Sequence, residues 1–175
     1  VPHYHAMNKI LILTRGAPGV GKTTYLKKIG LYDFVVSPDQ IRSEIGGITE
    51  LSDGSQVRGS FDERDVWLQV KKEISSKMKK GGLVIVDATF QRTRDFTLPL
   101  SIAKINKYEV IVLDFTMIPK DQAIRQNSQR QGWKLVPDDV ISRAYKNFRK
   151  ESIPKGLKVI PYSRFTNTSE YKNLH

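Results

Sequence analysis

The sequence predicts an α/β fold in which helices flank a doubly wound, mainly parallel five-stranded sheet. Two observations lead to this expectation. Short, β-rich apolar runs alternate with segments of helical periodicity, and nearly unbroken apolar runs are typical of parallel strands buried on both faces. The first of these runs also leads directly into a glycine-rich turn and then into a helical segment. The chain of 175 residues fits one domain, which we expect to span residues 7–175.

The expected strands are the apolar runs 9–14, 33–37, 83–90, 108–116 and, less clearly, 157–162. A first helix follows Gly21 and stops at Gly30. Ser60 and Glu63 form a capping box that opens a second helix, whose inward face carries Trp67, Val70, Ile74 and Met78. Pro119 and Pro137 each start a further helix, and the second has an apolar inward face at Val140, Ile141, Ala144, Tyr145 and Phe148. Residues 46–59 have no periodicity and many small polar residues, which predicts a mobile loop.

The charge of the chain is strongly positive, with 29 Lys and Arg against 18 Asp and Glu, a net charge of +11 and a pI near 9.8. Such a field attracts polyanions and is the usual footprint of nucleic-acid binding, although excess lysine can also simply keep a protein soluble. No apolar run approaches the roughly 20 residues that cross a bilayer, so no membrane is expected. The absence of cysteine rules out disulfides and agrees with a cytoplasmic setting. Residues 1–6, VPHYHA, are expected to be an expression-tag remnant.

The run GAPGVGKT fits the pattern G-x-x-x-x-G-K-[ST], with a strand before it and a helix after it. Glycines allow successive backbone amides to converge on phosphate oxygens. Lys22 should then reach the β- and γ-phosphates of an NTP, and the Thr23 hydroxyl should bind Mg²⁺ directly. The residues expected to bind the nucleotide here are Gly16, Ala17, Pro18, Gly19, Val20, Gly21, Lys22, Thr23 and Thr24.

The stretch SPDQIR, residues 37–42, follows the second strand, so it is expected near the phosphate-binding loop at the carboxyl edge of the sheet. Asp39 could accept the proton of an attacking hydroxyl, and Arg42, one helical turn on, could bind an acceptor phosphate. Ser37, Pro38 and Asp39 also make a sound helix start. On this stretch alone, both interpretations stand.

The third strand ends in Asp87, and a carboxylate there often holds a magnesium-bound water or orients an arginine. Capping of the following turn is the alternative, but the apolar strand delivers Asp87 to the ligand edge, which favours function. Thr89, Gln91 and Arg92 follow on that rim. Thr89 and Gln91 are expected to contact the substrate, although all three could be plain loop residues.

The helix expected over residues 120–132 has little apolar face, which predicts a lid that can move. Arg125 and Arg130 could then close on the phosphates, with a solvated surface helix as the alternative. Their spacing places them roughly 140° apart around a helix, so both reach one atom only if the helix ends between them. Trp67 is expected in the core, and Trp133 in core or rim packing rather than stacked on a base.

Taken together, these stretches resemble the polynucleotide 5′-kinase family, which includes the kinase domain of phage polynucleotide kinase–phosphatase, bacterial RNA-repair kinases and the kinase module of fungal tRNA ligases. The resemblance covers residues 8–150 and rests on GAPGVGKTT, SPDQIR, VIVDATF and RQNSQRQGWKLVPDDVISRAYKNFRK. It implies a P-loop kinase fold with a helical lid, in which Lys22 and Thr23 hold ATP and Mg²⁺.

The resemblance also implies roles for the acceptor side and the lid. Asp39 would be the general base on the 5′-hydroxyl, Arg42 would bind the phosphate 3′ of the accepting nucleotide, and Asp87 would support that arrangement. Asp39 and Asp87 are further expected to contact Mg²⁺ through water. Arg130 would be the lid arginine on the transferring phosphate. Arg125 is also counted as nucleotide-binding, although RQNSQR has one residue more between its arginines than the R-x-x-x-R pattern of the family.

The expected function is therefore an ATP-dependent polynucleotide 5′-hydroxyl kinase that acts on RNA or DNA ends in nucleic-acid repair. A P-loop kinase acting on a nucleoside, a sugar or a nucleotide-sugar is the alternative, and a non-catalytic nucleotide- or RNA-binding module is a third possibility. Some relatives carry phosphatase or ligase domains on the same polypeptide. This chain shows neither a ligase lysine motif nor the paired aspartates of such a phosphatase, which leaves open that it is the kinase part of a longer polypeptide or acts with a partner phosphatase or ligase domain.

Overall fold

In the computed structural model, which describes residues 8–174, five parallel strands form one sheet in the order β2-β5-β1-β6-β7. All five expected strands are present, and the predicted α/β fold is confirmed. The expected tag remnant, residues 1–6, lies outside the described residues. The strands are β1 (Ile10–Arg15), β2 (Val35–Val36), β5 (Val84–Val86), β6 (Glu109–Asp114) and β7 (Lys158–Pro161).

The central strand β1 is buried on both faces because its side chains alternate between two apolar layers. Ile12 packs into the layer beneath the helices α2 (Lys22–Lys28) and α7 (Asp138–Lys150). Leu11 and Leu13 pack into the opposite layer, beneath α3 (Pro38–Gly46), α4 (Glu63–Lys80) and α5 (Thr97–Ile105). The nearly unbroken apolar run of β1 follows from this two-sided burial.

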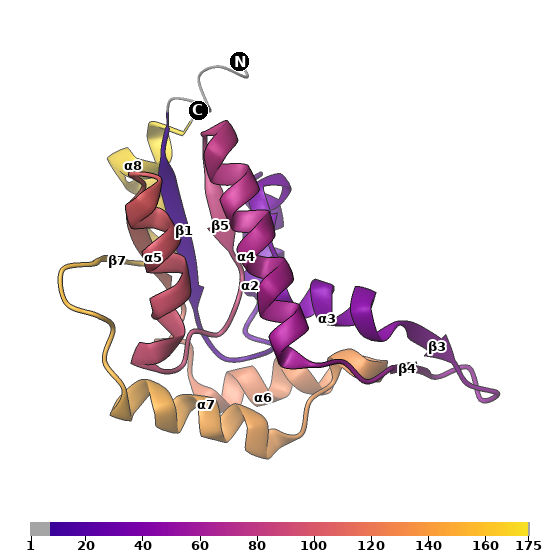
Figure 1. The fold of residues 1–175 in the computed structure, drawn as a ribbon. Helices are drawn as coiled ribbons and strands as arrows, with labels where there is room; N and C mark the ends of the chain where they lie inside the picture. The colour runs from indigo at the N-terminus through magenta and orange to yellow at the C-terminus, as the bar shows by residue number, and fades with distance from the viewer. Residues whose placement is uncertain (1–7, 175) are drawn as a thin grey trace.

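Helix α6 (Lys120–Ser128), which was predicted to be a lid, and α7 cross beneath the end of the sheet toward which β1 runs (Figure 1). Short 3₁₀ segments complete the chain: η1 (Tyr32–Phe34), η2 (Thr93–Phe96), η3 (Gly132–Lys134) and η4 (Tyr162–Asn167), the last followed by α8 (Ser169–Lys172). Within residues 8–174, no helix combines the length and apolar character needed to span a bilayer. The described chain begins before β1 and ends after α8, at the opposite end of the sheet from α6 and α7.

The capping box expected at Ser60 is wrong. Helix α4 begins at Glu63, and its N-cap is Asp62, whose carboxylate accepts a hydrogen bond from the Arg64 amide at 2.9 Å. The Glu63 carboxylate is engaged by Arg42 instead, so it is not available to the backbone of Ser60.

Residues 46–59, expected to form a mobile loop, form a hairpin instead. Strand β3 (Ile48–Glu50) pairs antiparallel with β4 (Gln56–Arg58), and the hairpin extends from the body beside α3 (Figure 1). At its base, Gly46 and Gly59 approach so closely that a Cβ on Gly46 would lie 2.3 Å from the Gly59 oxygen. The backbones cross there because neither residue has a side chain, and this close contact fixes the hairpin against α3.

Candidate active site

The phosphate-binding loop, residues 16–21, connects the end of β1 to the start of α2. Gly19 and Gly21 have φ values of +81° and +95°, a region that favours glycine. Gly16 is required for a different reason, because a Cβ at this position would lie 2.8 Å from Cβ of Phe115. The Gly16 amide donates to the Thr89 carbonyl at 3.2 Å, which ties the loop to the segment after β5.

Lys22 lies inside this loop. Its Nζ donates to the carbonyls of Gly16 and Ala17 at 2.8 and 2.9 Å, and the residue is 8% exposed. Burial lowers the pKa of the Lys22 ammonium to about 8, while the nearby Asp87 carboxylate opposes this shift. A phosphate bound in the loop would add negative charge and stabilise the ammonium form.

Thr23 and Asp87 meet beside the loop. The Thr23 hydroxyl donates to Oδ2 of Asp87 at 2.7 Å, and Oδ1 of Asp87 lies 3.4 Å from the Thr14 hydroxyl. These hard oxygen atoms fit Mg²⁺, which is usually bound by one or two carboxylates together with substrate phosphates. No group of three or more acidic, histidine or cysteine residues suited to a metal occurs among the described residues, so phosphate oxygens and water would complete the shell. Sequence reasoning missed Thr14.

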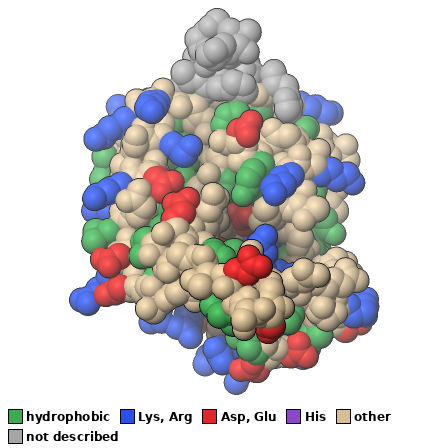
Figure 2. Space-filling model, turned by 90° about the vertical axis from the view of Figure 1, so that its right-hand side faces the viewer, with side chains coloured by type: hydrophobic (Ala, Val, Ile, Leu, Met, Phe, Trp, Pro, Cys, Tyr) green, Lys and Arg blue, Asp and Glu red, His purple; other side chains and the backbone are tan. Residues whose placement is uncertain are grey.

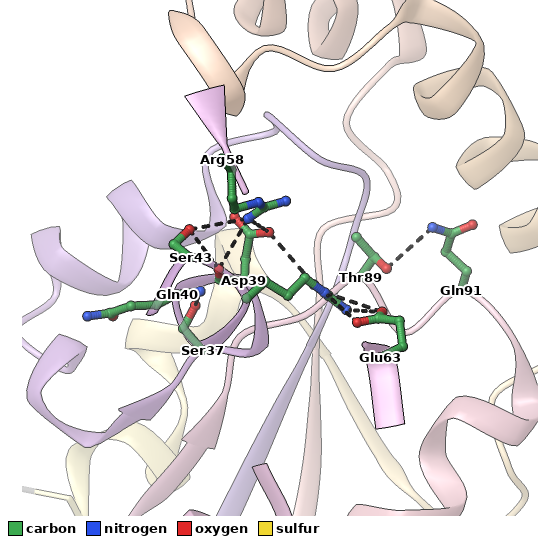
Figure 3. A network of polar contacts seen from close by, with 9 residues as sticks. Ser37, Asp39, Gln40, Ser43, Arg58, Glu63, Thr89 and Gln91 are labelled. Atoms are coloured by element: carbon green, nitrogen blue, oxygen red, sulfur yellow. Dashed lines mark hydrogen bonds and ion pairs between the residues drawn. The ribbon is translucent and has the colours of Figure 1, made fainter. Parts of the chain in front are cut away.

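Asp39 lies in the first turn of α3. The Ser37 hydroxyl accepts from the Gln40 amide at 3.1 Å, so Ser37 caps the helix and the Asp39 carboxylate is left for other partners. Its Oδ1 accepts a hydrogen bond from Arg58 at 2.9 Å and lies 3.7 Å from Nη1 of Arg42 (Figure 3). The helix-start interpretation is therefore confirmed for Ser37, while the functional interpretation of Asp39 stays a prediction.

Arg42, predicted to bind an acceptor phosphate, is engaged by an internal anion. Its Nε and Nη2 donate to the two carboxylate oxygens of Glu63 at 3.0 and 2.8 Å. In Figure 3, Glu63 lies on the side of Asp39 that faces Thr89 and Gln91. The planar guanidinium thus grips a carboxylate in the two-point manner that also suits a phosphate.

Arg58, from β4, is a site residue that sequence reasoning missed. Besides the Asp39 carboxylate, its Nη1 contacts the Asp39 carbonyl and the Ser43 hydroxyl, each at 3.3 Å. Its guanidinium lies 4.8 Å from the Trp133 ring and 5.1 Å from the Phe61 ring. Trp133 therefore packs at the rim. The available signal was Asp53-Gly54, a hairpin-turn pair within a stretch that otherwise lacks periodicity.

Helix α6 ends at Ser128, between Arg125 and Arg130, yet the two arginine side chains diverge. Arg130 turns toward the phosphate-binding loop: its Nη1 would lie 3.6 Å from a Cβ on Gly19. That nitrogen is buried without a hydrogen-bond partner in the described part of the chain, and burial lowers the pKa of Arg130. Arg125 is 67% exposed and pairs with Asp121 along the outer side of α6.

The polar helix α6 is better anchored than its composition predicts. Asn127 is 1% exposed; its side-chain amide donates to the Val136 carbonyl at 2.7 Å and accepts from the Val136 amide at 3.1 Å. The Asn127 Cβ would also lie 3.3 Å from a Cβ on Gly19. Sequence reasoning missed this residue, which fixes the lid helix beside the loop.

Thr89 and Gln91 follow β5 on the rim. The Gln91 side chain donates to the Thr89 hydroxyl at 3.3 Å and accepts from Asn147 of α7 at 2.8 Å. Between them, Phe90 is buried with a φ of +45°, an uncommon conformation for a residue with a bulky side chain. Both side chains are thus held at the rim by partners within the protein.

Positive charge on the face toward which the hairpin projects is spread around its edge rather than gathered in one patch (Figure 2). The same view shows a hollow near the centre, with acidic, basic and apolar side chains beside it. On this face the basic side chains therefore form no single patch.

Comparisons with known proteins agree with this architecture. The model of a family described as AAA domain matches residues 11–152. A chain of the Pnkp1/Rnl/Hen1 RNA repair complex is similar, with a TM-score of 0.66 and 20% identity over 86% of this chain and 50% of that one. The AvrRxo1-ORF1:ORF2 complex with ATP gives a TM-score of 0.56 and 18% identity over 81% of this chain and 48% of that one.

A sugar kinase from Janibacter sp. covers nearly the whole chain, with a TM-score of 0.55 and 13% identity over 95% of this chain and 90% of that one. The chain spans about half the length of the RNA repair and AvrRxo1 chains that it matches. No curated protein sequence matches it. The matched residues include the phosphate-binding loop, Asp39, Asp87 and the lid. The chain has the fold of P-loop kinases and belongs to the AAA domain family.

Proposed function

We propose that this protein transfers the γ-phosphoryl group of ATP, or of another NTP, to a 5′-hydroxyl end of RNA or DNA. One observation carries the proposal: burial lowers the pKa of both Lys22 and Arg130, and in each case the nearby Asp39 carboxylate opposes that shift. A carboxylate that belongs to the acceptor side is therefore within electrostatic range of the two cations at the phosphate-binding loop. This is the arrangement in which a base can act on a hydroxyl beside a bound γ-phosphate.

On the donor side, the loop amides and the Lys22 ammonium bind the phosphates. The Arg130 guanidinium, which has a buried nitrogen without a partner in the described chain, offsets the charge that develops on the transferring group. Thr23 and Asp87 would hold Mg²⁺, which supplies charge neutralisation of the β- and γ-phosphate oxygens.

On the acceptor side, Asp39 takes the proton of the 5′-hydroxyl as its oxygen attacks the γ-phosphorus. Arg42 binds the phosphate 3′ of the accepting nucleotide once that phosphate displaces Glu63. A net charge of +11 favours the approach of a polyanion. The similarity to a chain of an RNA repair complex supports the choice of acceptor, although it shows the fold alone.

Phosphoryl transfer to a small molecule is the second candidate. It is favoured by the pairing of Arg42 with Glu63, which occupies the guanidinium that was predicted to bind an acceptor phosphate. The similarity to a sugar kinase over nearly the full length agrees with this candidate.

The test is transfer from γ-labelled ATP to matched 5′-hydroxyl RNA and DNA oligonucleotides, with a nucleoside 3′-phosphate, a nucleoside and a panel of sugars alongside. The proposal predicts labelled oligonucleotides and an oligonucleotide affinity that falls steeply with added salt. Label on sugars or nucleosides alone, independent of salt, would replace the first candidate with the second.

A further inference from the structure

We propose that Arg58 is a positioning residue that orients the Asp39 carboxylate toward the acceptor hydroxyl, and that the Phe61 and Trp133 rings hold Arg58 in place. This inference rests on the proposed function, because it assigns Asp39 the role of base. It adds to that function a residue from the hairpin β3–β4, a segment to which the polynucleotide-kinase resemblance assigns no role.

The two oxygens of the Asp39 carboxylate have different surroundings. Oδ1 accepts a hydrogen bond from Nη1 of Arg58 at 2.9 Å and lies 3.7 Å from Nη1 of Arg42. Oδ2 has no hydrogen bond among residues 8–174. A carboxylate held through one oxygen presents the other in a fixed direction, which is what a base needs for transfer of a proton from a bound hydroxyl.

Arg58 is itself held by contacts with several neighbouring side chains. Its side chain is 19% exposed, and its guanidinium carbon lies over the Phe61 and Trp133 rings while Nη1 contacts the Ser43 hydroxyl. A planar, delocalised cation can stack on aromatic rings and donate from its edge at the same time, whereas a lysine ammonium cannot combine these contacts. The orientation of Asp39 therefore depends on arginine in particular.

The hairpin that carries Arg58 is fixed at two points. Its base is joined to the end of α3 by a hydrogen bond from the Gly59 amide to the Gly47 carbonyl at 2.8 Å. Its strand β4 packs on η3, where a Cβ on Gly132 would lie 3.2 Å from the Gln56 carbonyl. Because η3 directly follows the lid segment that carries Arg130, the hairpin connects the base on α3 with the lid.

Arg58 supports the transfer of the γ-phosphoryl group from ATP to the acceptor hydroxyl. The acceptor hydroxyl oxygen forms a bond to the γ-phosphorus of ATP, and the bond from that phosphorus to the β–γ bridging oxygen breaks, so ADP leaves with the electron pair. The hydroxyl proton passes to Oδ2 of Asp39 and then to solvent. Arg58 takes no part in bond making and keeps Oδ2 directed at the hydroxyl.

A double-mutant cycle in the full chain tests this role, with kcat and both KM values measured for Arg58→Ala, Asp39→Asn and the double variant. We expect Arg58→Ala to lower kcat about 10- to 100-fold with the KM for ATP unchanged. The double variant should be no slower than Asp39→Asn alone, because Arg58 acts through Asp39. Arg58→Lys should recover only part of kcat, and Arg64→Ala, an exposed arginine on α4, should match the parent.

Losses that multiply in the double variant would overturn the inference, as would full activity of Arg58→Lys. A second measurement separates it from the proposed function: the carboxyl ¹³C resonance of Asp39, assigned through Asp39→Asn, should shift in Arg58→Ala and stay in place in Arg64→Ala. If the parent phosphorylates no acceptor, the proposed function fails and this resonance decides whether Arg58 holds the carboxylate. An unmoved resonance overturns the inference even in a fully active enzyme.

Discussion

The ion pair between Arg42 and Glu63 leads to a testable prediction about how tightly the acceptor binds. If an acceptor phosphate must displace the Glu63 carboxylate, then Glu63→Gln should strengthen acceptor binding. The Arg42 side chain is 23% exposed and the Glu63 side chain 56%, and ion pairs at such positions contribute about 0.5–1 kcal/mol. Removing that competition should lower the KM for a nucleoside 3′-phosphate about two- to fivefold.

The matched measurement uses the same nucleoside without its 3′-phosphate. Its KM should not change in Glu63→Gln, because it brings no anion to Arg42. Glu73→Gln, which alters another carboxylate of α4, should leave both values at those of the parent. An unchanged KM for the nucleoside 3′-phosphate, or an equal fall for both acceptors, would refute the displacement of Glu63.

Three further predictions concern the loop and the lid. Because burial lowers the pKa of Lys22 to about 8, its ammonium form is lost as the pH rises, so calorimetry should show weaker ATP binding at pH 9 than at pH 7; a flat profile would contradict this. Asn127→Ala leaves the Val136 amide and carbonyl without their partner and should lower the free energy of unfolding by about 1–3 kcal/mol in urea titrations; an unchanged midpoint would argue against this anchor. Arg130→Ala should lower kcat by about 10²-fold, far more than Arg125→Ala, because only Arg130 faces the loop; equal losses would place both arginines on the phosphates.

Much of the fold could be predicted because its signals are local. Strand β1 and the glycine run after it are contiguous in the sequence. Because a parallel strand buried on both faces needs apolar residues at successive positions, such a strand can be recognised as an apolar run. The juxtaposition of Asp39 with the loop was also predictable, since the carboxyl ends of parallel strands share one edge of the sheet. An end of α6 between Arg125 and Arg130 was predicted to be necessary for both to reach one atom, but it is not sufficient, because Arg125 pairs with Asp121 on the helix surface.

What could not be predicted depends on contacts between distant segments. Arg58 becomes a site residue only because the hairpin is docked on α3 at Gly46 and Gly59 and on η3 at Trp133. The same is true of Glu63, whose side chain was assigned to a local cap but is recruited by Arg42 from another helix. Local capping rules fail where a long-range charge partner offers a stronger contact.

The central claim is that Asp39 acts as the base for phosphoryl transfer to a nucleic-acid end. The most direct test compares Asp39→Asn with Glu44→Gln, a carboxylate-to-amide change on the exposed side of the same helix, in transfer from γ-labelled ATP to a 5′-hydroxyl oligonucleotide. We predict that Asp39→Asn loses about 10²- to 10⁴-fold in kcat while ATP binding is retained, and that Glu44→Gln transfers at the rate of the parent. Transfer by Asp39→Asn at the rate of the parent, or no transfer by the parent itself, would contradict the claim.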